Sequence, residues 1–188
     1  MSTLVKLSRI NVIGTSGSGK STFAKKLSEE LGLSYIELDK IFWGPNWRWP
    51  SDDEFFAELK AALTQPAWIL DGNYTRTIPI KWEQIDLVIW LDYSFSVTLF
   101  QAIKRAIKRS LTKEELWPGT GNRESFRKSF FSKESIIWWT IKTHAKVRDK
   151  YESYLVDPKF GHIKFVRLQN RAEAQKFISE FKKVYRLG

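Results

Sequence analysis

A glycine-rich octapeptide near the N-terminus constrains the fold of this chain more than any other feature. Residues Gly14–Ser21 read G-T-S-G-S-G-K-S and fit the pattern G-x-x-x-x-G-K-S. A β-branched run, Leu7–Ile13, precedes the octapeptide, and Ser21–Leu31 follows it with apolar residues at helical spacing. A strand, a glycine-rich turn and a helix in this order predict a phosphate-binding loop at a helix N-terminus.

Each residue type in this loop has a physical role. The glycines allow the backbone to turn so that successive N–H groups face one point, and the helix dipole adds partial positive charge there. Lys20 can reach the β- and γ-phosphates of a nucleotide, and the Ser21 hydroxyl can ligate Mg²⁺. We therefore expect ATP and Mg²⁺ as ligands, with Lys20 catalytic and Ser21 at the metal. The residues expected to contact the nucleotide are Gly14, Thr15, Ser16, Gly17, Ser18, Gly19, Lys20, Ser21 and Thr22.

Strand-like and helix-like patterns alternate along the rest of the chain. This alternation predicts right-handed βαβ units and a parallel sheet with helices on both faces, an α/β fold whose ligands bind beyond the carboxyl ends of the strands. No linker divides the sequence, so residues 1–188 are expected to form a single domain. The expected strands are Leu7–Ile13, Tyr35–Leu38, Ala67–Leu70, Leu87–Leu91 and His162–Leu168, and the longer expected helices are Ser21–Leu31, Val97–Leu111, Glu134–Leu155 and Asn170–Tyr185.

Composition excludes several other classes of protein. The sequence has no cysteine and two histidines, which rules out disulfides, zinc–thiolate sites and a cysteine nucleophile. No apolar run is long enough to span a membrane and no signal peptide is evident, so we expect a cytoplasmic protein without membrane contact. The net charge of +10 suits anionic partners, nucleic acid among them. The sequence contains no recognisable nucleic-acid-binding motif, however, so nucleic acid is not the favoured partner.

A second motif follows the expected strand Ala67–Leu70. Asp71 to Arg76 read D-G-N-Y-T-R, which resembles the D-G-F-P-R segment of adenylate-kinase-like nucleoside monophosphate kinases. The resemblance implies that Arg76 holds the phosphate of the acceptor and that Asp71 orients magnesium-bound water. This sequence departs from the pattern at Asn73 and Tyr74 and has one inserted residue. The alternative is an ordinary surface turn, since Asp-Gly is a common turn pair.

Further charged residues fall where such kinases place theirs. Asp92 ends an apolar strand, as the second acidic motif of P-loop enzymes does, which implies a second-sphere magnesium ligand; the alternative is a helix cap. Arg105 and Arg109 lie four residues apart on one face of a basic helix, and Arg123 and Arg127 follow in a glycine-containing loop. In the resembled kinases such arginines neutralise the phosphates during transfer, so these four are expected to be catalytic. The alternative is that these arginines lie on solvent-exposed helix faces and have no catalytic role.

The chain as a whole resembles the topology modulation proteins, small P-loop kinases related to adenylate kinase. That resemblance implies a P-loop NTPase fold, a three-layer α/β/α sandwich with a five-stranded parallel sheet ordered 2-3-1-4-5. It also implies ATP as the donor, an acceptor-binding insertion at about residues 39–66 and a lid at about residues 111–127. The segments that carry the resemblance are Leu38–Trp43, Pro45–Trp47, Trp68–Tyr74, Leu116–Trp117, Asn122–Ser125 and Val166–Leu168.

The acceptor is less constrained than the donor. Asp39 is expected to close the second strand and face the acceptor, where an aspartate can hold a substrate hydroxyl as a general base would; it could instead cap a helix or form a salt bridge. Trp43 is a candidate acceptor contact, and with Trp47 and Trp49 it could stack on a planar base or form a small aromatic core. Asn170 could line the adenine site or cap the last helix with Glu173.

These observations lead to one main prediction of function and two alternatives. The main prediction is ATP-dependent phosphoryl transfer to a small, nucleotide-like acceptor by a monomer or weak dimer. The first alternative is a kinase that phosphorylates a hydroxyl group of a small molecule. The second is a DNA-binding, topology-modulating protein regulated by ATP, for which the positive charge is the supporting feature.

Overall fold

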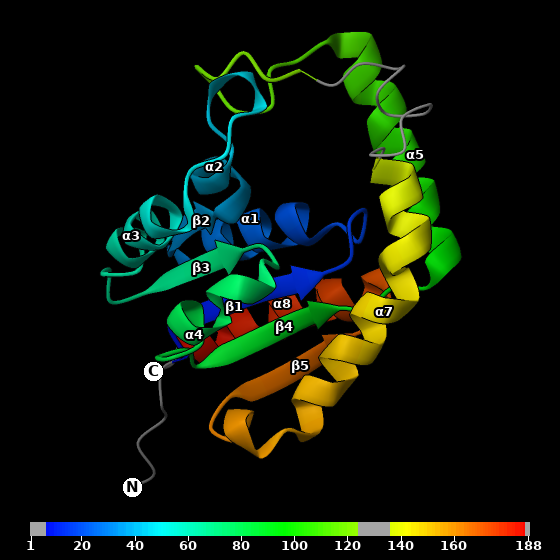
Figure 1. The fold of residues 1–188 in the computed structure, drawn as a ribbon. Coiled ribbons are helices and arrows are strands. Elements are labelled where there is room, and N and C mark those ends of the chain that lie inside the picture. The colour runs from blue at the N-terminus through cyan, green and yellow to red at the C-terminus, as the bar shows by residue number, and fades with distance from the viewer. Residues whose placement is uncertain (1–6, 124–135, 187–188) are drawn as a thin grey trace, which may run out of the picture.

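A single parallel sheet forms the centre of the molecule. The computed structural model describes residues 7–123 and 136–186. Its five strands are ordered β2-β3-β1-β4-β5, all parallel, so the predicted order 2-3-1-4-5 is confirmed (Figure 1). The strands are β1 (Arg9–Gly14), β2 (Ser34–Glu37), β3 (Trp68–Asp71), β4 (Leu87–Leu91) and β5 (Lys164–Leu168).

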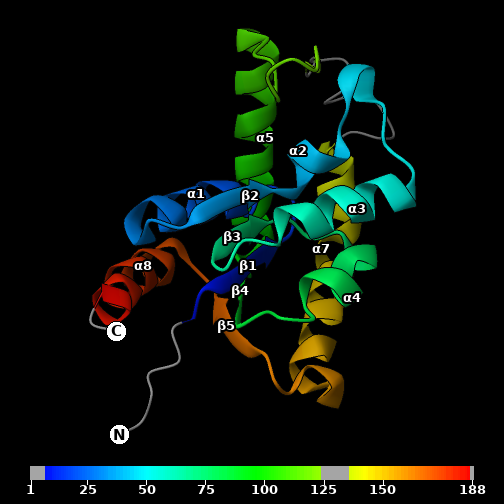
Figure 2. The same ribbon diagram turned by 90° about the vertical axis from the view of Figure 1, so that its left-hand side faces the viewer.

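Helices cover both faces of this sheet, which gives the predicted three-layer α/β/α arrangement (Figure 2). Those on one face are α1 and α8, while α3, α4 and α7 cover the other. The helices are α1 (Lys20–Leu31), α2 (Leu38–Phe42), α3 (Asp52–Ala62), α4 (Ile78–Lys81), α5 (Phe95–Thr112), α7 (Ile136–Val156) and α8 (Arg171–Arg186), with short 3₁₀ turns at η1 (Pro45–Trp47), η2 (Thr75–Thr77) and η3 (Pro158–Phe160).

Two apolar cores hold the layers together, one on each face of the sheet. Phe23 and Leu27 of α1 pack with Ile178 of α8 on the first face. Phe55 of α3 and Tyr151 of α7 belong to the second core. Every residue of β4 is buried, as expected for a parallel strand covered on both sides. No helix in the described ranges is long and apolar enough to cross a membrane.

Local sequence signals fix several helix ends. Gly32 ends α1 in the left-handed conformation with its N–H donating to the Ser28 carbonyl, as the glycine predicts. Ser51 and Glu54 form a reciprocal capping box at the start of α3. Asn170 accepts a hydrogen bond from the Glu173 N–H at the start of α8, so Asn170 has the predicted capping role.

The second strand ends one residue earlier than the sequence predicts. Leu38 is the first residue of α2 instead of the last of the strand, and Asp39 lies in the first helical turn. Leu38 is fully buried against Gly72, where a Cβ would lie 2.7 Å from the Leu38 Cβ. Leu38 therefore packs against the turn after β3 at the point where β2 ends. Glu37, and not Asp39, is therefore the last residue of β2.

Candidate active site

The loop between β1 and α1 has a geometry that only glycine permits at two points. Gly17 has a φ of 84°, and a Cβ there would lie 2.7 Å from the Thr98 carbonyl oxygen of α5. Gly14 has a φ of 155°, and a Cβ there would lie 2.8 Å from the Leu91 carbonyl oxygen. Both contacts are closer than real Cβ atoms show, so a side chain at either position would displace the loop from α5 or from β4.

Asn73 fastens the first residue of this loop. Its Oδ1 accepts from the Gly14 N–H at 3.1 Å, and its Nδ2 donates to the Gly14 carbonyl at 2.7 Å. The departure from D-G-F-P-R at this position is the sequence signal that could have identified the role. Because Asn73 follows β3 and Gly14 ends β1, the pair ties the phosphate loop to the neighbouring strand.

A buried lysine supports the segment that carries Asn73. Lys81 is 1% exposed, and its Nζ donates to the backbone carbonyls of Gly72 and Asn73. Burial, together with the nearby positive charge of Lys150, lowers the pKa of Lys81 to about 7. The amine therefore holds the turn after β3 while losing about half of the charge that an ordinary lysine carries at neutral pH.

The loop also presents polar groups that the described part of the protein does not pair. Thr15 Oγ1 and Ser18 Oγ are buried without a hydrogen-bond partner. Unpaired buried hydroxyls cost free energy unless a ligand or water satisfies them. Arg105 of α5 reaches the same loop, since its Nη2 donates to Ser16 Oγ at 3.1 Å. The arrangement therefore suits a polar, anionic ligand.

Asp71 lies beside Lys20 and Ser21 at the end of the phosphate loop. Its side chain is 3% exposed. Burial raises the pKa of Asp71, and the positive charge of Lys20 and the Ser21 hydroxyl act in the opposite direction. Tyr35 donates to Oδ2 at 3.0 Å, while Oδ1 is buried and has no hydrogen-bond partner among the described residues. Three predicted site residues, Lys20, Ser21 and Asp71, thus meet at the carboxyl end of β3.

Glu37 is a site carboxylate that the sequence interpretation missed. It is paired in register with Asp71 on the neighbouring strand, so both side chains project from the same face of the sheet. Its Oε1 accepts from the Trp117 indole N–H at 3.1 Å. Burial raises the pKa of Glu37; the Trp117 hydrogen bond and the charge of Arg109 lower it, and the charges of Asp71 and Asp39 raise it.

Asp39 and Arg76, two of the predicted acceptor contacts, have different surroundings. Asp39 Oδ1 accepts from the Tyr74 hydroxyl at 2.7 Å and lies close enough to Glu37 to raise its pKa. Arg76 pairs with Asp52 of α3 at 2.7 Å and is 41% exposed. Its guanidinium also lies 5.0 Å from the centre of the Phe42 ring. In this structure Arg76 is therefore held at the edge of α3.

Two arginines bind the carboxylate of Asp92. Its Oδ2 accepts from Arg167 Nε at 2.8 Å and pairs with Arg148 of α7 at 3.1 Å. Arg167 also lies over the ring of Trp90, which packs in the core on the α7 face. The magnesium role of Asp92 stays a prediction, and the observed contacts instead join β4, β5 and α7.

The remaining predicted arginines are spread over the site and its rim. Arg105 contacts the loop as described, and the charge of Arg109 acts on Glu37. Arg123 is exposed at the far end of the loop after α5, where its Nη1 donates to the Lys113 carbonyl. Arg127 lies outside the described residues, as does the end of the predicted lid. Within the described residues no group of three or more acidic or histidine side chains could itself hold a metal ion.

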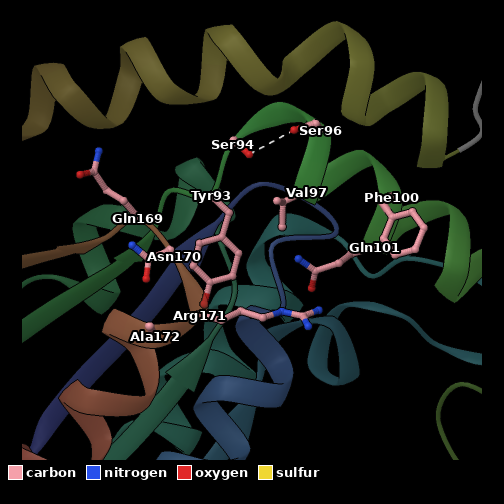
Figure 3. A pocket seen from close by; sticks show the side chains of 10 residues that line it. All are labelled: Tyr93, Ser94, Ser96, Val97, Phe100, Gln101, Gln169, Asn170, Arg171 and Ala172. Carbon is pink, nitrogen blue, oxygen red and sulfur yellow. Dashed lines mark hydrogen bonds between the residues drawn. The ribbon is translucent and has the colours of Figure 1, made fainter.

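A pocket of about 680 Å³ opens beside the C-terminal part of the loop (Figure 3). Residues from the start of α5 and from the turn between β5 and α8 line it, among them Phe100 and Arg171. Gln101 connects the pocket to the loop, because its Oε1 would lie 3.5 Å from a Cβ at Gly19. Gln169 also lines it, as does Asn170, one of whose expected positions was near the adenine. The pocket thus extends the phosphate loop toward β5.

Comparisons with known proteins support the fold. A scan against family models and a search of curated proteins both give no match. An unliganded sugar kinase from Janibacter sp. HTCC2649 is 16% identical, covering 95% of this chain and 94% of that one with a TM-score of 0.50. A gluconokinase from Sinorhizobium meliloti 1021 is 16% identical, covering 97% of each chain with a TM-score of 0.48. At this identity the likeness to the sugar kinase shows a shared α/β fold and no more, while membership of the topology modulation family stays a prediction.

Proposed function

We propose that this protein transfers the γ-phosphoryl group of ATP to a hydroxyl group of a small, uncharged, polyhydroxylated acceptor. The observation that carries the proposal is the meeting of Lys20, Ser21 and Asp71 beside the carboxylates at the end of β2. The first three residues match the needs of a triphosphate donor. The carboxylates match the needs of a hydroxyl acceptor, which donates hydrogen bonds and loses a proton.

The donor would lie along the loop and the pocket beside it. Backbone N–H groups of residues 15–17, 19 and 20 and the Lys20 ammonium would bind the phosphates, and the hydroxyls of Thr15 and Ser18, which have no partner among the described residues, would gain partners. The nucleoside would occupy the pocket between α5 and the β5–α8 turn. The apolar area of Phe100 and Val97 suits a flat base there.

The residues around Ser21 also fit Mg²⁺. The Ser21 hydroxyl and the buried, unpaired Oδ1 of Asp71 are hard oxygen donors, which this ion prefers. They would hold it together with phosphate oxygens and water. When bound, Mg²⁺ supplies charge neutralisation at the phosphates.

On the acceptor side, this chain would bind and deprotonate the hydroxyl group. The acceptor oxygen forms a bond to the γ-phosphorus, and the bond from that phosphorus to the β–γ bridging oxygen breaks. The hydroxyl proton passes to the carboxylate of Asp39, and the products are ADP and a phosphate monoester. Arg105, which already contacts the loop, would neutralise charge on the transferring group.

The charges favour an uncharged acceptor over a phosphorylated one. Glu37, Asp39 and Asp71 place three carboxylates at the carboxyl edge of β2 and β3, where a second anion would be repelled. Arg76, which would have to hold an acceptor phosphate, is paired with Asp52 instead. A nucleotide-like acceptor is the second candidate. It is supported by the Trp43 ring, which lies 5.5 Å from the Trp47 ring and 6.3 Å from the Trp49 ring, since such a cluster could contact a base.

A coupled assay of ADP release across acceptor classes tests the proposal. We expect turnover with sugars or other polyols that exceeds turnover with nucleoside monophosphates. Asp39→Asn should lower kcat by about 100-fold through the loss of base catalysis, with unchanged ATP affinity. Arg76→Ala should leave the acceptor KM within about twofold, since that side chain is engaged elsewhere.

Two outcomes would decide against the proposal. Preferred turnover of a nucleoside monophosphate, together with a large rise in its KM in Arg76→Ala, would establish the nucleotide candidate instead. ADP release that no acceptor stimulates would remove the kinase proposal altogether.

A further inference from the structure

The turn after β3 contacts both the donor side and the acceptor side of the site. Its sequence departs from D-G-F-P-R at Asn73 and Tyr74. Asn73 holds both backbone groups of Gly14 in the phosphate loop. Tyr74 reaches the other way, and its hydroxyl donates to Asp39 Oδ1 at 2.7 Å. The first departure therefore fastens the donor loop, and the second contacts the carboxylate that would accept the hydroxyl proton.

An aromatic cluster holds the ring of Tyr74 in place. The centre of this ring lies 5.0 Å from that of Phe42 in α2 and 5.4 Å from that of Phe55 in α3. Phe55 is fully buried, and Tyr74 packs against the core on that face of the sheet. Phe42 belongs to the same short helix as Asp39. The packing therefore fixes the phenol oxygen relative to the helix that carries Asp39.

The phenol acts toward Asp39 only as a hydrogen-bond donor. Burial and the negative charge of Asp39 raise the pKa of Tyr74. The charge of Arg76 and a hydrogen bond from the Trp43 side chain act in the opposite direction and leave the pKa raised. The hydroxyl thus keeps its proton at neutral pH, and Oδ1 of Asp39 stays occupied. Within the described residues no hydrogen bond reaches Oδ2 of Asp39, which is the oxygen left for a ligand.

We propose that Tyr74 is a positioning residue for Asp39, the carboxylate that accepts the proton of the acceptor hydroxyl. This inference rests on the proposed function. The bond to Oδ1 restricts rotation of the carboxylate, and a base held in one orientation meets the acceptor hydroxyl more often in a reactive geometry. The hydroxyl proton passes to Oδ2, and the phenol keeps its own proton throughout. Because Asn73 and Tyr74 are neighbours, one turn sets the acceptor base relative to the phosphate loop.

Steady-state kinetics of a double-mutant cycle test this role. The four proteins are the wild type, Tyr74→Phe, Asp39→Asn and the double variant, each assayed by ADP release with the sugar or polyol that the wild type phosphorylates fastest. Tyr74→Phe keeps the ring and loses the bond to the carboxylate, so we expect kcat to fall by about 10-fold and the KM of ATP to stay within about twofold. In the Asp39→Asn background the same change should alter kcat by less than about twofold, because no base remains to be positioned.

Tyr151→Phe is the matched control. Tyr151 belongs to the same core but lies on α7, and its hydroxyl is buried without a hydrogen-bond partner among the described residues. The control removes the same chemical group and should leave kcat unchanged in both backgrounds. Circular dichroism checks that each variant folds. If Tyr74→Phe does not fold, Tyr74→Met enters the same cycle under the same criterion, since methionine adapts to irregular apolar space.

The outcomes separate this inference from the proposed function. Wild-type enzyme that phosphorylates no sugar or polyol would overturn both, and so would a wild-type kcat retained in Asp39→Asn. A kcat that falls in Asp39→Asn and is unchanged in Tyr74→Phe would overturn the role of Tyr74 alone. An equal fall for Tyr74→Phe in both backgrounds would also overturn it, because the tyrosine would then act on the fold or on another step and not through the base.

Discussion

The buried amine of Lys81 makes stability depend on pH in a way that can be calculated. Lys81 is fully buried below Gly72 and Asn73, and its pKa falls from 10.5 to about 7 on folding. Between these two values the folded chain holds a neutral amine while the unfolded chain holds an ammonium ion. The unfolded state therefore binds more protons, and stability rises with pH across this window and is lost as pH falls toward 7.

The size of the effect follows from the two pKa values. One pKa unit corresponds to about 1.4 kcal/mol. From pH 7.5 to pH 9.0, well inside the window, the contribution of Lys81 should change by about 2 kcal/mol. Replacing the amine in Lys81→Met removes this dependence, because a thioether carries no proton in either state. Lys60→Met is the control, because Lys60 is an exposed lysine on α3 and its replacement leaves the buried amine of Lys81 in place.

Urea denaturation at the two pH values measures the effect. The free energy of unfolding of Lys81→Met minus that of the wild type should fall by about 2 kcal/mol from pH 7.5 to pH 9.0. Taking the difference cancels groups that titrate in both proteins. The corresponding difference between Lys60→Met and the wild type should be the same at both pH values. A difference for Lys81→Met that is constant across this range would refute the reasoning, since it would mean that the buried amine stays protonated in the folded protein.

Three further substitutions test individual parts of the site. Lys20→Ala should lower kcat by at least about 100-fold in a chain that still folds by circular dichroism, because the lysine neutralises transferring phosphate; unchanged turnover would remove its catalytic role. Asn73→Ala should cost about 1–3 kcal/mol in urea unfolding, because both backbone groups of Gly14 lose their partner; a loss below 0.5 kcal/mol would contradict the fastening role. Asp92→Asn should destabilise by a similar amount and leave the magnesium dependence of kcat unchanged; a shifted dependence would support the predicted metal role.

The parts of the fold that depend on nearby residues were predictable from the sequence. The phosphate loop is encoded within eight consecutive residues, so its position between a strand and a helix follows from the pattern alone. Gly32 and the pair Ser51 and Glu54 mark helix ends through bonds to residues within four positions. The sheet order was implied by the family resemblance, and the structure has that order.

The parts of the site that depend on distant partners were not predictable. Trp117 and Glu37 are 80 residues apart, and Asn73 and Gly14 are 59 apart, so no local pattern shows either contact. The D-G-N-Y-T-R motif predicted that Arg76 holds the acceptor phosphate, but the Arg76 guanidinium pairs with Asp52 on another helix. In each case the residue type indicated what chemistry was possible, and tertiary packing decided which partner was used.

Binding of a nucleoside triphosphate tests the central claim most directly. Titration calorimetry of the folded wild-type chain with ATP and Mg²⁺ should show one site per chain. Lys20→Ala should weaken that site by at least about 10-fold through the loss of one charged contact to phosphate. Wild-type protein that is folded by circular dichroism and takes up no nucleoside triphosphate would contradict the claim that residues 14–21 bind the phosphates of a nucleotide.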